Sequence, residues 1–190
     1  MKKFSLVLIL TLIAAAGAFA QVDAPIPEGK VQIIDNFENG NYWIWAGSDW
    51  DRWGGHKISW GADLHKAWVS EGKYSLELKL EPVPAGGESG TWFYDGSQDL
   101  SGGKYVVIDF YNPYPIVHSV SFILQTGDAW NWNQTQSYNL PQGQHTIVFD
   151  IQSFEPERLA EVKRINISSW VGTQTNYDTS IFIDNIRLIK

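Results

Sequence analysis

The 190-residue chain contains no cysteine and only one methionine. Without cysteine, neither a disulfide nor a cysteine-linked lipid anchor can form, so core packing, alone or with a bound metal, has to stabilise the fold. Apart from one apolar run near the N-terminus, no hydrophobic stretch is long enough to span a bilayer. We therefore expect the remainder of the chain to be soluble.

Common catalytic motifs are also missing. The histidines share no metal-ligand spacing, which argues against zinc; they are His56, His65, His118 and His145. No Gly-x-Ser-x-Gly nucleophile turn and no glycine-rich phosphate loop occur. A glycosidase needs two carboxylates about 5 to 10 Å apart. Acidic residues are abundant, but no local motif marks such a pair, so this enzyme class stays open.

Residues 1–20 have the features of a secretory signal peptide cleaved after Ala20. A basic start is followed by an apolar run and a small-residue site. Of 14 basic side chains, Lys2 and Lys3 lie in this segment, which leaves 12 against 21 acidic ones and a net charge of −9 for the mature chain. This charge excludes nucleic acid and anionic membranes as natural partners and suits a secreted or periplasmic protein with a neutral ligand.

Ten tryptophans are the most unusual feature of the composition. Many lie in short stretches rich in Gly, Asp and Asn, which predict surface loops. An indole offers an apolar face and an N–H donor, so a cluster of exposed indoles suits a flat ligand with polar edges, such as a sugar ring. For any single tryptophan, packing against a small β core remains an equal alternative.

Period-two alternation predicts half-buried strands over much of the chain, at residues 74–80, 105–111, 119–125, 146–150 and 181–188. One short helix is expected at residues 156–163. We therefore predict a signal peptide at 1–20, a flexible lead at 21–30, and one all-β domain at 31–190, a sandwich or barrel. Three polar residues alternate with the expected core positions: Asp109, Tyr111 and Gln125. We expect them either to form the base of a shallow groove or to be ordinary exposed polar residues.

Oxygen-bearing side chains end a first strand at residues 34–39 and lie within the last strand at residues 182–185. Asp35, Asn36 and Glu38 would meet Asp184 if the terminal strands lie side by side. Oxygen ligands of this kind suit Ca²⁺. The alternative is that they are simply surface acids at strand ends.

Four segments, taken in order, resemble the galactose-binding-like β-jelly-roll carbohydrate-binding modules appended to bacterial plant-cell-wall hydrolases: 35–38 (DNFE), 69–76 (VSEGKYSL), 99–112 (DLSGGKYVVIDFYN) and 182–188 (FIDNIRL). The resemblance covers nearly the whole mature chain. It implies a β-sandwich jelly roll of two antiparallel sheets whose concave face binds one glycan chain. It also implies a structural Ca²⁺, with Glu38 and Asp184 as the best-matching ligands and Asn36 and Asp35 as further ones.

The leading hypothesis is a secreted, non-catalytic, monomeric protein that binds a polysaccharide or oligosaccharide. In this hypothesis the stacking residues are Trp92, Tyr94, Trp130 and Trp132, and Trp50 and Trp53 form an outer wall. Asp109, Tyr111 and Gln125 bind hydroxyl groups. The alternatives are a small glycan-active enzyme on the same fold and a structural, surface-layer or flagellar-sheath-like protein, because fold alone does not fix the ligand.

Overall fold

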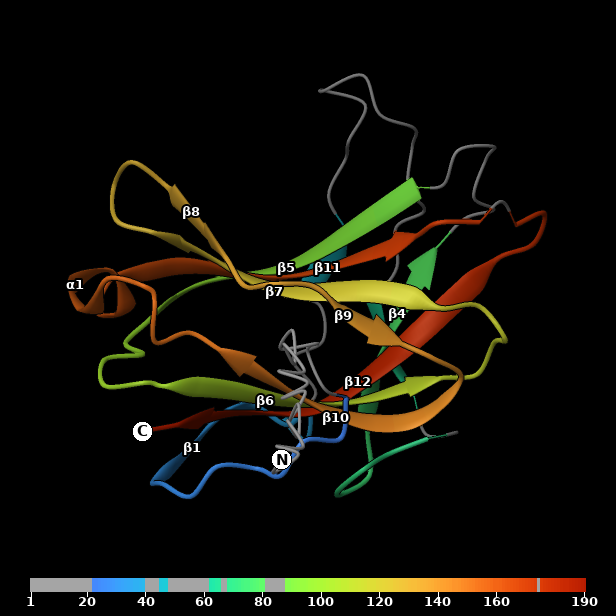
Figure 1. Ribbon diagram of the computed structural model, residues 1–190, viewed down its shortest axis with the longest axis horizontal. Coiled ribbons are helices and arrows are strands. Elements are labelled where there is room, and N and C mark those ends of the chain that lie inside the picture. Colours follow the sequence, from blue (N-terminus) through green and yellow to red (C-terminus); the bar gives the residue numbers. More distant parts are fainter. Residues whose placement is uncertain (1–21, 40–44, 48–61, 66–67, 81–87, 174) are drawn as a thin grey trace, which may run out of the picture.

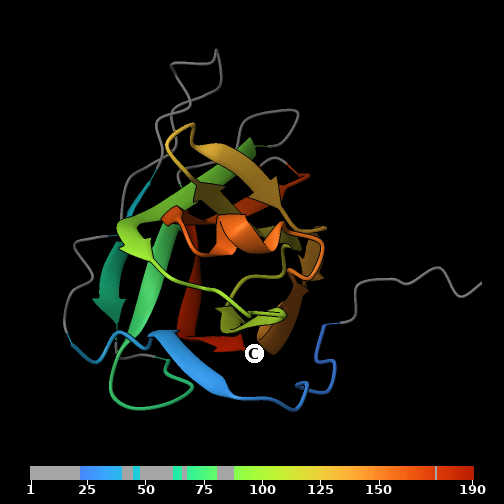
Figure 2. The ribbon, with the colours of Figure 1, turned by 90° about the vertical axis from the view of Figure 1, so that its left-hand side faces the viewer.

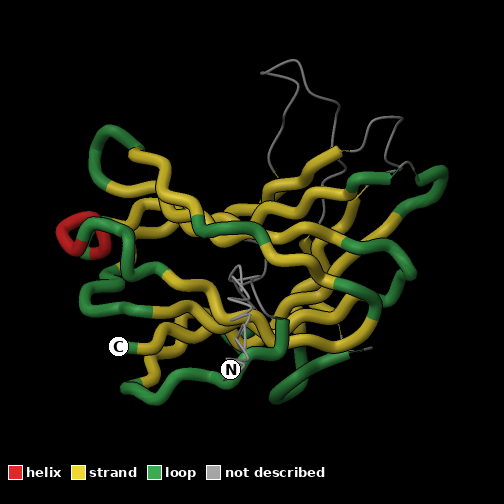
Figure 3. The backbone as a smooth tube through the Cα atoms, viewed as in Figure 1, coloured by secondary structure: helices red, strands yellow, loops and turns green. Residues whose placement is uncertain are grey.

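Two antiparallel β-sheets pack face to face in the protein (Figure 1). The computed structural model describes residues 22–39, 45–47, 62–65, 68–80, 88–173 and 175–190. Nearly all of the regular structure in these residues is strand, with one short helix at the end of the sandwich (Figure 3). The predicted all-β sandwich of two antiparallel sheets is confirmed.

The first sheet, sheet A, contains both terminal strands. Its order is β10 (Gly143–Asp150), β6 (Tyr105–Asn112), β12 (Thr179–Ile189), β4 (Ser75–Leu80) and β3 (Ala62–His65). β1 (Val31–Asp35) pairs with β12 beyond the end of β4. The first and last strands therefore lie side by side, which is the arrangement that calcium binding by the predicted acids requires.

The second sheet, sheet B, has the order β2 (Trp45–Gly47), β5 (Glu88–Gln98), β11 (Val162–Val171), β7 (His118–Thr126) and β8 (Asn131–Gln134). β9 (Tyr138–Leu140) pairs with the first residues of β7, and β8 pairs with its last ones. In Figure 1 β5, β11 and β7 of sheet B cross the upper part of the molecule, while β6, β10 and β1 of sheet A lie below them.

Alternation along the central strands builds the core between the sheets. Val106, Ile108 and Phe110 of β6 are fully buried and face fully buried residues of β7 such as Phe122 and Leu124. These are the positions that the period-two pattern assigns to the interior. Burial of this set stabilises the domain by roughly 1.5–3 kcal/mol for each large side chain.

A β-bulge in β12 changes which residues face the core. The register shifts between Asp184 and Arg187, and Asn185 has a positive φ of 51°. Before the bulge Ile183 points inward and Phe182 outward, whereas after it Ile186 points inward. Unbroken alternation over residues 181–188 would place Phe182 and Ile186 on one face, whereas the bulge places them on opposite faces.

The only helix in the described residues is α1 (Pro156–Leu159). It begins with proline, whose fixed φ suits a first helical turn. It ends four residues before the predicted boundary because β11 already begins at Val162. No helix in the described part of the chain is long and apolar enough to cross a membrane.

Hydrogen bonds tie the start of the described lead to sheet A. The Asp23 N–H donates to the Thr146 carbonyl, and the Thr146 N–H donates to the Asp23 carboxylate, both at 2.9 Å. His145 adds a contact of 2.9 Å from its Nδ1 to the same carboxylate. Asp23 therefore joins the lead to edge strand β10, and the chain then runs into β1, which lies along the bottom of Figure 2 beside the C-terminal strand.

Candidate functional site

Four side chains gather on the outer face of sheet B, where β7 turns into β8. Trp132 of β8 pairs with Gln125 of β7, and Gln125 pairs in turn with Arg164 of β11. Cross-strand partners share one face of a sheet, so these three residues form a row across three strands. Trp130 completes the group, because the Arg164 guanidinium carbon lies 5.1 Å from the centre of its ring. We call these four residues the platform.

The two tryptophans of the platform are exposed to solvent. Trp130 is 46% exposed and Trp132 is 50% exposed. The Trp132 Nε1 donates to the Gln134 Oε1 at 3.1 Å, which fixes the orientation of that ring. Exposed apolar groups gathered in one place and rimmed by polar side chains are typical of binding sites.

Trp130 also has an unusual backbone conformation. Its φ is +53°, and its N–H donates to the Gly127 carbonyl in the tight turn before β8. A bulky residue in the left-handed region is strained, and such strain, about 1–3 kcal/mol, is found mainly at functional sites. The sequence predicts an extended segment through both tryptophans, whereas the structure places Trp130 in the turn and Trp132 in the strand.

Hydrogen bonds beneath the platform hold the β7–β8 hairpin in place. The Asn133 Nδ2 donates to the Thr126 Oγ1 at 3.2 Å, and its Oδ1 accepts from the Arg158 Nη1 of α1 at 3.4 Å. Gln134 donates through Nε2 to the Ser121 Oγ at 2.9 Å. A surface supported in this way is preorganised, which lowers the entropy cost of binding.

The same face carries another exposed tryptophan at its far end. Trp170 of β11 is 46% exposed and pairs with Ser119 of β7. Ser119 precedes Gln125 by six residues, or ~20 Å at strand rise. Between them lie Ile123 and small or amide side chains, including Ser121 and the buried Asn166, whose Nδ2 has no hydrogen-bond partner among the described residues.

The structure places the other predicted stacking residues apart from the platform. Trp92 and Tyr94 lie in β5, where the backbone register sets them opposite Ile167 and Ile165 of β11. Stacking by these two residues therefore stays a prediction. Trp50 and Trp53, the predicted outer wall, lie outside the described residues.

Asp109 and Tyr111 do not share a face with Gln125, and that expectation is wrong. They lie on β6 in sheet A, whereas Gln125 lies on β7 in sheet B. Their side chains therefore cover the opposite outer face of the sandwich. There the Tyr111 ring stacks on Trp68 at 5.6 Å between centroids and lies 5.8 Å from Phe182.

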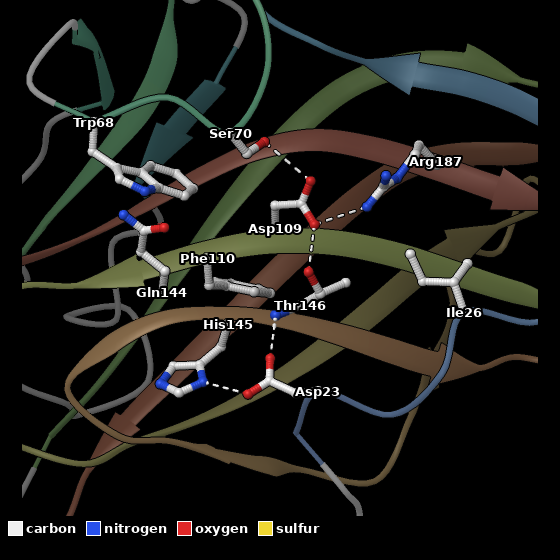
Figure 4. A pocket seen from close by; sticks show the side chains of 10 residues that line it. All are labelled: Asp23, Ile26, Trp68, Ser70, Asp109, Phe110, Gln144, His145, Thr146 and Arg187. Carbon is white, nitrogen blue, oxygen red and sulfur yellow. Dashed lines mark hydrogen bonds and ion pairs between the residues drawn. The ribbon is translucent and has the colours of Figure 1, made fainter.

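Asp109 borders a hollow of about 350 Å³ on the outer face of sheet A (Figure 4). Its Oδ1 accepts from the Thr146 Oγ1 and from the Arg187 Nη2, both at 2.8 Å, and its Oδ2 lies 3.0 Å from the Ser70 Oγ. Protein groups therefore already use both carboxylate oxygens. The arrangement ties β6, β10 and β12 to the segment before β4, which is a structural role.

The predicted calcium ligands hold a turn through hydrogen bonds. The Glu38 Oε1 accepts from the backbone N–H groups of Lys73 and Tyr74 at 2.7 and 2.8 Å, and these two bonds lower the pKa of Glu38. Asp184 accepts through Oδ2 from the N–H groups of Ser70 and Glu71 at 2.8 and 3.1 Å. Both acids therefore fix the same turn, from opposite ends.

The remaining two predicted ligands make local bonds. The Asp35 Oδ1 accepts from the Phe37 N–H at 2.9 Å, and the Asn36 Oδ1 accepts from the Glu38 N–H at 3.4 Å. Asp184 is fully buried, and this burial raises its pKa. Across the described part of the chain, no three His, Cys, Asp or Glu side chains converge on a metal site. Calcium binding by Glu38, Asp184, Asn36 and Asp35 therefore stays a prediction.

Sequence reasoning missed Arg164, Asn166 and Trp170. The signal was present, because these residues alternate with Ile165 and Ile167 along β11 in a period-two pattern. Assigning residues 156–163 to a helix hid the start of this strand.

The sequence matches no protein-family model and no curated protein. Solved structures do match. A carbohydrate-binding module of the β-sandwich superfamily, described for its promiscuous specificity, has a TM-score of 0.64 and 16% identity over 84% of this chain, which spans 62% of that structure. CBM28, a module specific for non-crystalline cellulose, has a TM-score of 0.61 and 16% identity, with 88% of this chain and 100% of CBM28 covered.

A third match is the mannan-recognising module TmCBM27, with a TM-score of 0.53 and 18% identity over 85% of this chain and 98% of the module. At these identities the likeness establishes the fold alone. The chain has the β-jelly-roll fold of carbohydrate-binding modules, which confirms the predicted resemblance at that level.

Proposed function

We propose that the protein binds a glycan chain on the outer face of sheet B, with its sugar rings stacked on the platform. The observation that carries this proposal is the pair of exposed indoles, Trp130 and Trp132, held beside the polar side chains of Gln125 and Arg164. The shared fold of carbohydrate-binding modules supports it.

The chemistry of the platform matches that of a sugar ring. One face of a pyranose presents C–H groups, which pack on an indole, while hydroxyl groups line its rim. Gln125 supplies both an amide donor and an acceptor, and Arg164 supplies donors only. A neutral, hydroxyl-rich ligand also avoids repulsion from the net negative charge of the protein.

The glycan runs along the strands in this proposal. Trp170 lies ~20 Å from the platform on the same face, so a short oligosaccharide contacts the platform alone while a longer one also reaches Trp170. Affinity should therefore rise with chain length until both ends of the face are occupied.

The proposed role is binding without catalysis. Glycoside hydrolysis requires a pair of carboxylates flanking the bond, and the four platform side chains include none. We further propose that the protein acts outside the cytoplasm as a monomer, after removal of the predicted signal peptide.

Affinity electrophoresis of residues 21–190 against glucans, mannans and xylans tests the proposal, with tryptophan fluorescence titration of the positive glycans. About half of the Trp132 indole, or roughly 100 Å², is available for a ligand to cover, worth about 2.5 kcal/mol. Trp132→Ala should thus weaken binding by well over tenfold. Tyr177→Ala, at an equally exposed aromatic away from the platform, is the matched control and should leave affinity unchanged.

Trp130→Gly separates a binding role from a structural one. Glycine removes the indole but accepts the positive φ without strain, so stability should stay within about 1 kcal/mol of the parent while glycan affinity falls. If Trp130→Gly unfolds the domain, or if no glycan of the panel binds, the platform is not a glycan site.

A further inference from the structure

A second hollow, of about 330 Å³, lies beside the platform at the edge of sheet B. It is formed where the chain leaves β8 and where it leaves β10 toward α1, at the end of the sandwich that faces the viewer in Figure 2. Every residue that lines it is polar: Gln134, Thr135, Gln136, Asp150, Gln152 and Ser153.

Gln134 connects this hollow to the platform. Its Oε1 accepts from the Trp132 Nε1, and its own amide nitrogen donates to the Ser121 Oγ on the outer face of sheet B. Because Gln134 also lines the hollow, a ligand stacked on Trp132 lies next to the opening of the hollow.

The lining is held in place from both sides. The Thr135 Oγ1 accepts from the Phe122 N–H at 3.1 Å. This side-chain hydrogen bond replaces the backbone bond that a neighbouring strand would make at the edge of the sheet. On the other side, the Gln152 Nε2 donates to the Tyr105 Oη at 2.9 Å, and the Gln152 N–H donates to the Asp150 Oδ1 at 2.8 Å. These bonds preorganise the hollow for a ligand.

We infer that this hollow is a second subsite, which takes a single-sugar branch of the glycan whose main chain lies on the platform. The inference rests on the proposed function. Amide and hydroxyl groups both donate and accept, which suits the hydroxyl groups of a neutral sugar. The volume lies at the small end of the ~300–1,000 Å³ range of ligand sites, which suits one sugar rather than a second chain.

Branched substrates should therefore bind more tightly than unbranched ones with the same main chain. Two pairs of probes test this by isothermal titration calorimetry: cellohexaose against a xyloglucan oligosaccharide, and mannohexaose against a galactosyl-substituted mannan oligosaccharide. In at least one pair the branched member should bind about tenfold more tightly to the mature protein.

Gln136→Ala and Gln152→Ala should reduce that advantage by about 3- to 10-fold each, the cost of a lost hydrogen bond. They should leave the affinity for the unbranched member unchanged. Gln142→Ala, at an exposed glutamine in the turn before β10, is the matched control and should change neither affinity. Trp132→Ala should weaken both members together.

The outcomes separate this inference from the proposed function. If unbranched glycans bind through Trp132 but branches give no gain, or if the gain survives in both glutamine variants, the branch subsite is refuted and the platform stands. If neither member of either pair binds, the branch subsite is refuted; if in addition no glycan of the wider panel binds, the proposed function fails as well.

Discussion

Acid should destabilise the protein through one buried histidine. His118 is fully buried between the sheets, where its Nδ1 lies 2.9 Å from the Ser169 Oγ and its Nε2 has no hydrogen-bond partner among the described residues. No described acceptor compensates a second proton on this ring. Burial lowers the pKa of His118 to about 4 from the ordinary value of 6.5.

The lowered pKa of His118 determines whether acid raises or lowers the stability of the folded protein. Between about pH 6.5 and pH 4 the unfolded chain holds a proton on His118 that the folded chain does not, so stability rises with pH in this window and falls on acidification. The loss amounts to about 2 kcal/mol between pH 7.5 and pH 5, and to about 3 kcal/mol below pH 4. This is a large share of the ~5–15 kcal/mol that stabilises a typical domain.

Urea unfolding at pH 7.5 and pH 5.0 measures the loss, with His118→Gln as the comparison. Glutamine keeps a hydrogen-bonding group but does not titrate. Carboxylates titrate in both proteins, so the difference between the two losses isolates His118 and should be about 2 kcal/mol. An equal loss in both proteins, or an NMR titration midpoint of the His118 imidazole near 6.5, would refute the reasoning.

Three further predictions concern the acidic residues. Asp184→Asn should lower the free energy of unfolding by about 1–3 kcal/mol, because an amide NH₂ then faces N–H donors. Melting curves in chelator and in millimolar calcium test the predicted metal site: a calcium-dependent rise in melting temperature that Asp184→Asn abolishes is the expected result, and identical curves would refute the site. The mature protein should release no reducing sugar from any glycan that it binds; release that one carboxylate-to-amide change eliminates would assign a catalytic role.

Local pattern is enough to predict much of the core. Side chains alternate in any strand, so Val106, Ile108 and Phe110 are identified as interior positions without knowledge of the sheet. Which sheet a strand joins is not a local property. β6 and β7 follow one another in sequence yet belong to different sheets, and this separates Asp109 and Tyr111 from Gln125.

The part of the candidate site that lies close together in sequence could be predicted, and the part that depends on sheet pairing could not. Trp130, Trp132 and Gln125 are near one another in sequence, and one hairpin brings them together. Arg164 reaches the platform only through the pairing of β11 with β7. No short sequence motif predicts that pairing. The bulge at Asn185 likewise depends on tertiary contacts and reverses the expected direction of Phe182.

The pairing of β1 with β12 has a practical consequence for building with this domain. The backbones of Lys30 and Lys190 exchange hydrogen bonds of 3.3 and 3.0 Å, so the two chain ends of the sandwich meet on sheet A while the platform lies on the outer face of sheet B. Immobilising the protein on a resin by either end leaves the platform pointing into solution. A short linker from Lys190 to residue 29, with new ends opened at the exposed turn around Gly102, would give a circular permutant that keeps both sheets intact.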